Sequence, residues 1–315
     1  MISREVAVRL TATNFPHGPE KLAEKIGVEI LSSPLVGVEG WCIQGLNTAT
    51  IRINSTSSPF RQRFTLAHEL AHLVLGTKPD IATEPFRSDR QEECDADQLA
   101  SEFLIPIEQV NAHFRGHLPI DAKTLKRLAK AARVSPVMAA CRVVNAAVGL
   151  GLKNAGVFFF AGGIQQWSYS PTLRFDESEG EELLKEAMKC YPNLVRLDNS
   201  DGNVVVGSMI DAQDYQVLLV QLLPEEEATK ETQEERIRSL ASELFDNDST
   251  FRPSIAGSLG VLKGKCQGKN LSEAVDFFYT QYVGVKYSGD REKVLLSTKG
   301  REYIRLYLER WFHDA

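Results

Sequence analysis

The amino-acid sequence predicts an α+β protein with more than one domain, and three observations lead to this prediction. The chain has 315 residues, about twice the length of a typical single domain. Up to about residue 150, helical periodicity surrounds two short β-rich runs, whereas strand-like apolar runs dominate from about residue 155. Hydrophobic residues make up 43% and charged residues 25%, which is typical of proteins that fold around ordinary apolar cores.

The first predicted domain, residues 1–118, opens with an amphipathic helix and two strands. The helix is expected over Pro19–Ile26, and the strands over Gly40–Leu46 and Thr48–Asn54. A longer helix should follow between Ser58 and Gly76. Ser58 can cap its first turn and Gly76 can end it, since glycine readily adopts the left-handed conformation that closes helices.

A further helix is expected from Ser88 to the neighbourhood of Pro106. Ser88 and Gln91 have the spacing of a capping box, in which each side chain bonds to the other residue's backbone. Five apolar residues recur at helical spacing and mark the buried face: Ala96, Leu99, Ala100, Phe103 and Leu104.

Residues 119–150 have the pattern of a helix-turn-helix. Helices are expected over Asp121–Ala132 and Pro136–Asn145, with a short turn at Val134 and Ser135. The segment is basic, with Lys123, Lys126, Arg127, Lys130, Arg133 and Arg142 against one acidic residue, Asp121. This charge fits either a surface for DNA or an acidic partner, or a helical hairpin with solvated charges that supports the first domain.

Residues 155–315 are predicted to form a separate α+β sensor or regulatory domain. Its strands are expected within VFFFAG (157–162), NVVVGSMI (203–210) and YQVLLVQLLP (215–224), and helices over Glu179–Cys190 and Lys299–Phe312. The acidic stretch Glu225–Glu235 is interpreted as a solvated helix face.

Composition narrows the function classes. The net charge of -6 argues against a protein that coats nucleic acid through its overall charge. The five cysteines stand singly, which favours free thiols in a reducing compartment. The N-terminal segment carries charges where a signal peptide would be apolar, and the most apolar region is interrupted by polar residues. A cytoplasmic protein without a membrane partner is therefore expected.

The segment His68-Glu69-Leu70-Ala71-His72 carries the clearest chemistry. Residues four apart lie on one helix face, so both imidazoles can bind one metal ion while Glu69 serves as the general base. Chance would produce this five-residue pattern in roughly one chain in a hundred of this composition. Its place in a well-capped helix gives the rigid support that a metal site needs.

A catalytic zinc site normally has three protein ligands, so one more ligand is required. The helix that follows offers Glu92 and Glu93, which flank the centre of its apolar face on opposite sides. Periodicity does not choose between them. A group that stabilises the oxyanion is also required, and the candidates are His113, His117, Arg61 and Arg63.

Two segments, RQRFTLAHELAHLVLG and EECDADQLASEFLIP, resemble the paired signature of the ImmA/IrrE family of metallo-endopeptidases, and the likeness extends over roughly residues 15–145. The second signature begins with a glutamate, matched by Glu93, and continues with alanine three positions later. The resemblance therefore implies His68, His72 and Glu93 as metal ligands in a zincin-like fold. Asp97 departs from the asparagine frequent in the family, which leaves a contact to a ligand open.

The resemblance also implies a function. Such a protein would be a zinc-dependent endopeptidase, with manganese as the alternative metal, that cleaves a helix-turn-helix transcriptional repressor. Appended domains in the family are often GAF-like sensors, so a stress or phage-related signal, such as a nucleotide or nucleic acid, is the expected trigger. The alternatives are a DNA-binding regulator that uses the protease fold as a scaffold, and a toxin-like zinc hydrolase.

Overall fold

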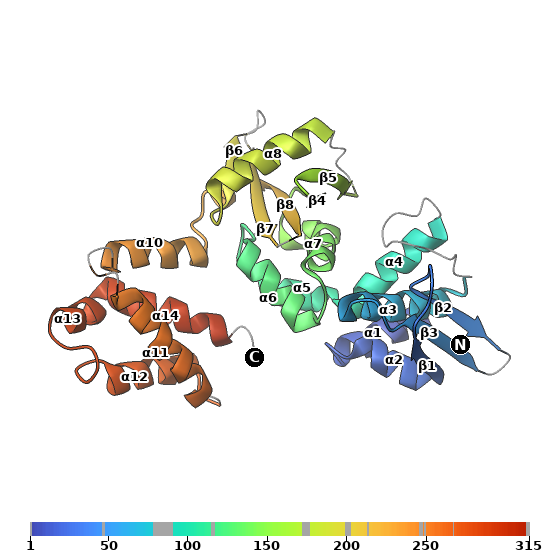
Figure 1. The fold of residues 1–315 in the computed structure, drawn as a ribbon, viewed down its shortest axis with the longest axis horizontal. Helices are drawn as coiled ribbons and strands as arrows, with labels where there is room; N and C mark the ends of the chain where they lie inside the picture. The colour runs from blue at the N-terminus through green and yellow to red at the C-terminus, as the bar shows by residue number, and fades with distance from the viewer. Residues whose placement is uncertain are drawn as a thin grey trace. The chain divides into compact units, whose positions relative to one another are not determined.

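A computed structural model gives the fold in two compact units, residues 1–229 and residues 230–315 (Figure 1). The structure describes residues 2–45, 48–77, 91–114, 117–171, 177–198, 203–212, 214–245, 248, 250–266 and 268–312.

The first unit begins with a small mixed sheet packed against helices. Its elements are α1 (Arg4–Thr13), α2 (Gly18–Ile26), β1 (Val28–Ser33), β2 (Gly40–Gln44), β3 (Ala49–Asn54), α3 (Pro59–Leu75), α4 (Gln91–Leu104) and α5 (Ile107–Phe114). The strand order is β1-β3-β2, with β1 parallel and β2 antiparallel to β3. The helix and the two strands predicted before Ser58 are confirmed. Strand β1 was not expected, because its residues are mostly exposed and show no alternation.

Helix α3 is delimited as the sequence predicts. The side chain of Ser58 accepts a hydrogen bond from the backbone N–H of Arg61, and Gly76 ends the helix with φ of 70°. Eleven residues of α3 are buried, among them His68, Glu69 and His72. Helix α4 is described from Gln91 onward, so the predicted capping box at Ser88 lies outside the described residues.

Where β2 crosses α3, the backbone requires glycine. A Cβ at Gly40 would lie 2.5 Å from the Cγ2 atom of Thr65 and 2.7 Å from the carbonyl oxygen of Arg52. The absence of a side chain thus allows strand β2 to pass close to the helix that carries the histidines.

The second half of the first unit is a five-stranded antiparallel sheet with helices on both faces. It comprises α6 (Ala122–Ala132), α7 (Pro136–Asn145), η1 (Ala147–Leu150), β4 (Asn154–Ala161), β5 (Ile164–Tyr169), α8 (Glu177–Cys190), β6 (Val195–Asp198), β7 (Asn203–Asp211), β8 (Tyr215–Pro224) and α9 (Glu225–Ala228). The strand order is β5-β4-β8-β7-β6. Helix α8 packs on one face, and α6 and α7 pack on the other (Figure 1). The predicted helical hairpin and the three predicted strands are confirmed.

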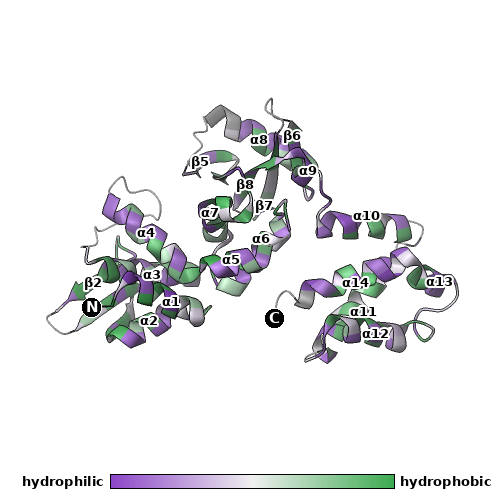
Figure 2. Ribbon diagram, turned by 180° about the vertical axis from the view of Figure 1, so that it is seen from behind, coloured by the Kyte–Doolittle hydropathy of each residue, from purple (hydrophilic) through white to green (hydrophobic). Residues whose placement is uncertain are grey.

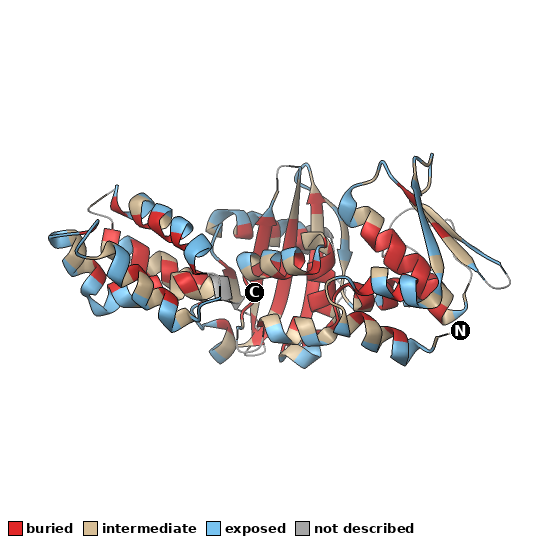
Figure 3. Cartoon of the chain, turned by 90° about the horizontal axis from the view of Figure 1, so that it is seen from below, coloured by how far each residue is buried: buried red, intermediate tan, exposed pale blue. Residues whose placement is uncertain are grey.

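The boundaries of the two units differ from the sequence-based division, which carried one domain from 155 to 315. A single apolar core includes Ala140 of α7, Val157 of β4 and Leu219 of β8, so the sheet is continuous with the helices before it. The three central strands, β4, β8 and β7, are largely buried (Figure 3). The chain divides instead between Thr229 and Lys230.

The second unit is helical and has its own core. Its helices are α10 (Gln233–Phe245), α11 (Phe251–Lys265), α12 (Leu271–Tyr282), α13 (Asp290–Leu296) and α14 (Thr298–Phe312). Hydrophilic and hydrophobic residues alternate along α10 and α14, as in helices with one buried face (Figure 2). Among the described residues of the whole chain, no helix combines the length and the apolar character needed to cross a bilayer.

Candidate metal centre

Three buried side chains converge between α3 and α4. The Nε2 atoms of His68 and His72 lie 3.0 Å apart, at 3.2 and 3.4 Å respectively from one carboxylate oxygen of Glu93. His68 is 9% exposed, His72 1% and Glu93 2%. Two imidazole nitrogens and one carboxylate oxygen are thus directed to a common point in the protein interior.

The two glutamates at the start of α4 have different environments. Glu93 is buried and lies beside both histidines, whereas Glu92 is exposed. Both stand in the first turn described for this helix, so the difference arises from which side of α4 packs against α3. The sequence-predicted residues His68, His72 and Glu93 are therefore brought together, and Glu92 is not part of the cluster.

The second ring nitrogen of each histidine has a partner that fixes the ring. Nδ1 of His68 lies 2.8 Å from Oδ1 of Asp97, and Nδ1 of His72 lies 2.7 Å from Oγ1 of Thr77. Such partners select the tautomer that leaves Nε2 available to a metal. The sequence had left open whether Asp97, in a place where the family often has asparagine, contacts a metal ligand. In the structure Asp97 contacts His68. Thr77 was not singled out in the sequence, although its position directly after the helix-ending Gly76 places it beside His72.

Burial and neighbouring charges shift the titration of this cluster. Burial raises the pKa of Glu69 to about 7; His68 opposes this rise, and the charge of Glu93 adds to it. Burial and the charge of His68 lower the pKa of His72. For His68, burial acts to lower the pKa, but the hydrogen bond and charge of Asp97, with the other carboxylates, outweigh it and raise the pKa.

The donor set fits a divalent metal ion. Two imidazoles and a carboxylate are a common protein ligand set for catalytic zinc. Glu69 belongs to the same helix turn, and its Oε2 is buried without a hydrogen-bond partner among the described residues. A buried carboxylate oxygen of this kind is costly unless a ligand or water uses it, so its place beside the histidines is a functional signal.

The four sequence-based oxyanion candidates lie in different settings. Arg63 is buried and donates to Glu20 and to the backbone oxygens of Pro16 and Ala132, so its guanidinium joins three segments of the fold. Arg61 lies 3.6 Å from Glu39 in an ion pair. In α5, Nδ1 of His113 lies 2.9 Å from the backbone oxygen of Gln109. The backbone N–H of His117 donates to Phe114.

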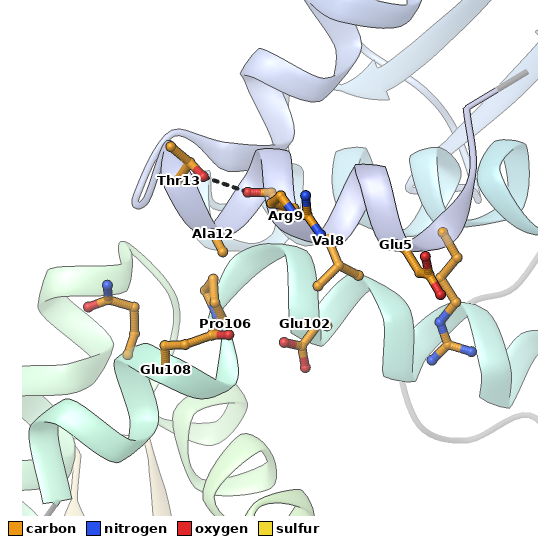
Figure 4. Close-up of a pocket in the computed structure, with 10 residues that line it drawn as sticks. Glu5, Val8, Arg9, Ala12, Thr13, Glu102, Pro106 and Glu108 are labelled. Carbon is orange, nitrogen blue, oxygen red and sulfur yellow. Dashed lines mark hydrogen bonds between the residues drawn. The ribbon is translucent and has the colours of Figure 1, made fainter.

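A separate hollow of about 730 Å³ lies between α1 and the α4–α5 junction (Figure 4). Charged residues of both signs line it, including Arg9, Glu5 and Glu108. His68, His72 and Glu93 are not among its lining residues. This hollow is therefore distinct from the candidate metal centre.

Comparison with known proteins identifies the domain that carries the cluster. Residues 23–144 match the family model of the peptidase M78 family described as the IrrE N-terminal-like domain. No curated protein matches the chain. Among solved structures, a Mycobacterium tuberculosis transcriptional regulator is similar, with a TM-score of 0.44 and 14% identity over 69% of this chain and 74% of that one. The resemblance to the ImmA/IrrE family is thus confirmed for the N-terminal part, where residues 23–144 match the IrrE N-terminal-like domain.

Proposed function

We propose that the protein is a zinc-dependent endopeptidase in which His68, His72 and Glu93 bind the metal and Glu69 is the general base. The observation that carries this proposal is the buried meeting of three metal-ligand side chains, two of them oriented by Asp97 and Thr77. The match of this segment to a peptidase family supports the same assignment. The same donors also bind manganese, which stays the alternative metal.

Each residue then has a defined task. Zinc, when bound, supplies Lewis-acid polarisation of the scissile carbonyl and acidification of water. Glu69 accepts a proton from the attacking water and returns it to the leaving amine. Asp97 and Thr77 hold the imidazoles in the tautomer that presents Nε2.

The proposed substrate is a helix-turn-helix transcriptional repressor, as the family resemblance implies. We further propose that the five-stranded sheet after residue 154, covered by α8 and sharing its core with α7, is a GAF-like regulatory module that senses a stress or phage-related ligand. Such a ligand acts only through a difference in affinity between active and inactive states. Near-complete switching requires a difference of roughly 5 kcal/mol.

A DNA-binding regulator is the second candidate, and the basic residues of α6 favour it. Lys123, Lys126 and Lys130 lie on the exposed side of this helix. The following helix, which would read a DNA groove in a helix-turn-helix, is buried from Met138 to Val144. This burial favours the supporting role for the hairpin. If the protein binds DNA, the exposed lysines of α6 would contact the phosphate backbone of the DNA.

The direct test compares wild-type protein with Glu69→Gln after zinc loading. The amide has the same shape but cannot accept a proton, so zinc content should persist while proteolysis falls by at least about a hundredfold. Cells that express either form are searched for new protein N-termini. We expect Glu69-dependent cleavage in a helix-turn-helix repressor. If both samples contain the same protein N-termini, and if Lys126→Glu abolishes DNA binding by the protein, the DNA-binding regulator is favoured instead.

A further inference from the structure

A largely apolar pocket of about 670 Å³ is lined in part by Phe64, whose ring centroid lies 6.0 Å from that of His68. Two aromatic residues of α3, Phe60 and Phe64, form one wall, and Leu104 at the end of α4 adjoins them. The opposite wall comes from α7 and from the five-stranded sheet. The pocket is thus lined both by α3 and α4, the helices that carry the histidines and Glu93, and by the five-stranded sheet.

The two helices of the metal cluster lead into this pocket. Phe60, Phe64, His68 and His72 follow one another at four-residue spacing and form one stripe along α3. The ring centroids of Phe64 and His68 are 6.0 Å apart. On α4, Glu93, Asp97 and Leu104 are separated by four and seven residues and also share a face. The pocket therefore begins at Phe64, one helical turn from His68.

The sheet contributes an aromatic surface. Phe159 stacks on Trp167 with ring centroids 5.4 Å apart and an interplanar angle of 11°, and Tyr215 lies 5.4 Å from the same phenylalanine. All three residues line the pocket. Phe60, which also lines the pocket, is 48% exposed. Together these rings offer stacking and apolar contacts to an apolar or aromatic group.

The polar residues of the pocket come from the segment before strand β2, the start of α3 and the start of α7. Glu39 immediately precedes this strand, bonds to the hydroxyl of Ser57 at 2.5 Å and pairs with Arg61 at 3.6 Å. Strand β2 is an edge of its sheet, so one side of it can pair with an extended peptide. Glu39, Ser57 and Arg61 thus give the pocket a polar margin beside its apolar interior.

We propose that this pocket binds a large apolar side chain of the protein substrate, a few residues away from the scissile bond. The inference rests on the proposed endopeptidase function. Phe64 and Phe60 precede His68 by four and eight residues, or about 6 and 12 Å of helix at 1.5 Å per residue. An extended peptide advances about 3.3 Å per residue, so the bound side chain is roughly two to four residues from the cleaved bond.

The five-stranded sheet then takes part in substrate selection, because its residues Phe159, Trp167 and Tyr215 line the pocket. Two variants of the full-length protein test this. Trp167→Ala removes part of the aromatic wall, and Val137→Trp places bulk in the pocket from the first turn of α7. Ile164→Ala is the matched control, since Ile164 lies on the same strand as Trp167, is 64% exposed and does not line the pocket.

The zinc-loaded proteins are incubated with a proteome-derived peptide library, and cleavage products are sequenced. Wild type and Ile164→Ala should prefer Phe, Leu, Met, Trp or Tyr at one position two to four residues from the cut. Replacing that residue by alanine in the best peptide should lower kcat/KM about tenfold or more in wild type, but little in either pocket variant.

The outcomes separate two failures. If wild type cleaves peptides with no such preference, or if both pocket variants keep it, the pocket assignment is overturned while the endopeptidase proposal stands. If the wild-type protein and Glu69→Gln give the same cleavage products, the endopeptidase function itself is contradicted, and the pocket assignment falls with it.

Discussion

At the scale of single residues, the chemistry of the site depends on which atoms of each side chain are already engaged. The imidazoles of His68 and His72 each have Nδ1 bound to an oxygen, so Nε2 is the atom left for a metal. Glu93 and Glu69 are both buried, and their mutual repulsion is relieved when a cation lies between the carboxylates and the histidines. Two substitutions follow from this arrangement.

Glu93→Ala should abolish stoichiometric zinc binding, whereas Glu92→Ala should leave it unchanged. Glu93 presents a carboxylate oxygen to both Nε2 atoms, and Glu92 is exposed to solvent. Metal analysis of the purified variants measures the difference, and circular dichroism checks that both are folded. If only Glu92→Ala lost zinc, Glu92 rather than Glu93 would be the metal ligand.

Asp97→Ala should lower zinc affinity by about 10- to 100-fold, the range typical of partners that orient a ligand. Asp97→Asn should lose less, because its amide oxygen still accepts a hydrogen bond from Nδ1 of His68. Competition with a chelator measures both affinities. Asp95→Ala, an exposed position on the same helix, is the control. Equal affinities for all three variants would exclude an orienting role.

At the scale of elements, buried arginines join helices that are distant in sequence. Arg142 of α7 is 6% exposed; its Nε donates to the backbone oxygen of Ile105 at 2.8 Å, and its guanidinium pairs with Glu102 of α4. Arg63 joins α3 to the segments around Pro16 and Ala132 in the same way. The basic residues predicted from the sequence therefore differ in role: Lys123, Lys126, Lys130 and Arg133 are exposed, Arg127 is half-buried, and Arg142 is a buried structural arginine on α7.

Arg142→Ala should reduce the free energy of unfolding by about 3 kcal/mol, because it leaves Glu102 and a buried carbonyl without their donor. Lys126→Ala should change it by less than about 0.5 kcal/mol, as expected for an exposed position. Urea denaturation followed by circular dichroism compares them. A similar loss in both variants would contradict the structural assignment of Arg142.

At the scale of the whole molecule, the peptidase-like segment and the five-stranded sheet share one apolar core. Helix α7 contributes Ala139, Ala140 and Val143 to it, and strand β4 contributes Ala155 and Val157. The helical second unit has a core of its own, built around residues such as Phe278 and Tyr303. Where the chain is cut should therefore decide whether the fragments fold.

A chain ending at Thr229 should unfold cooperatively, and so should residues 230–315 expressed alone, because each retains a complete core. A chain ending at Asn154 should aggregate or melt without a sharp transition, since it exposes the surface that the sheet covers. Differential scanning calorimetry and size-exclusion chromatography distinguish these cases. A cooperative, monomeric fragment 1–154 would show that the sheet is dispensable for the peptidase fold.

Much of the local structure could be predicted because its causes are local. Ser58 and Gly76 delimit α3 through hydrogen bonds and a positive φ that involve neighbouring residues only. His68 and His72 face the same side because a helix repeats every 3.6 residues. Strand β1 was not predicted because its cause is not local. Its mostly exposed residues show no alternation of buried and exposed positions, and it is a strand because it pairs with β3.

The sequence by itself determined α2, α3, the α6–α7 hairpin and the shared face of the two histidines, because periodicity, capping and motif spacing act over a few residues. It did not delimit α1, α5 or α10 to α13. Periodicity left Glu92 and Glu93 open and the family resemblance implied Glu93, which the tertiary structure brings to the histidines; the tertiary structure alone decided that Asp97 and Thr77 hold their rings. It also decided that Arg142 is buried and that the sheet joins the peptidase core. These outcomes depend on which sides of distant elements pack together, and burial of apolar surface over the whole unit selects that packing.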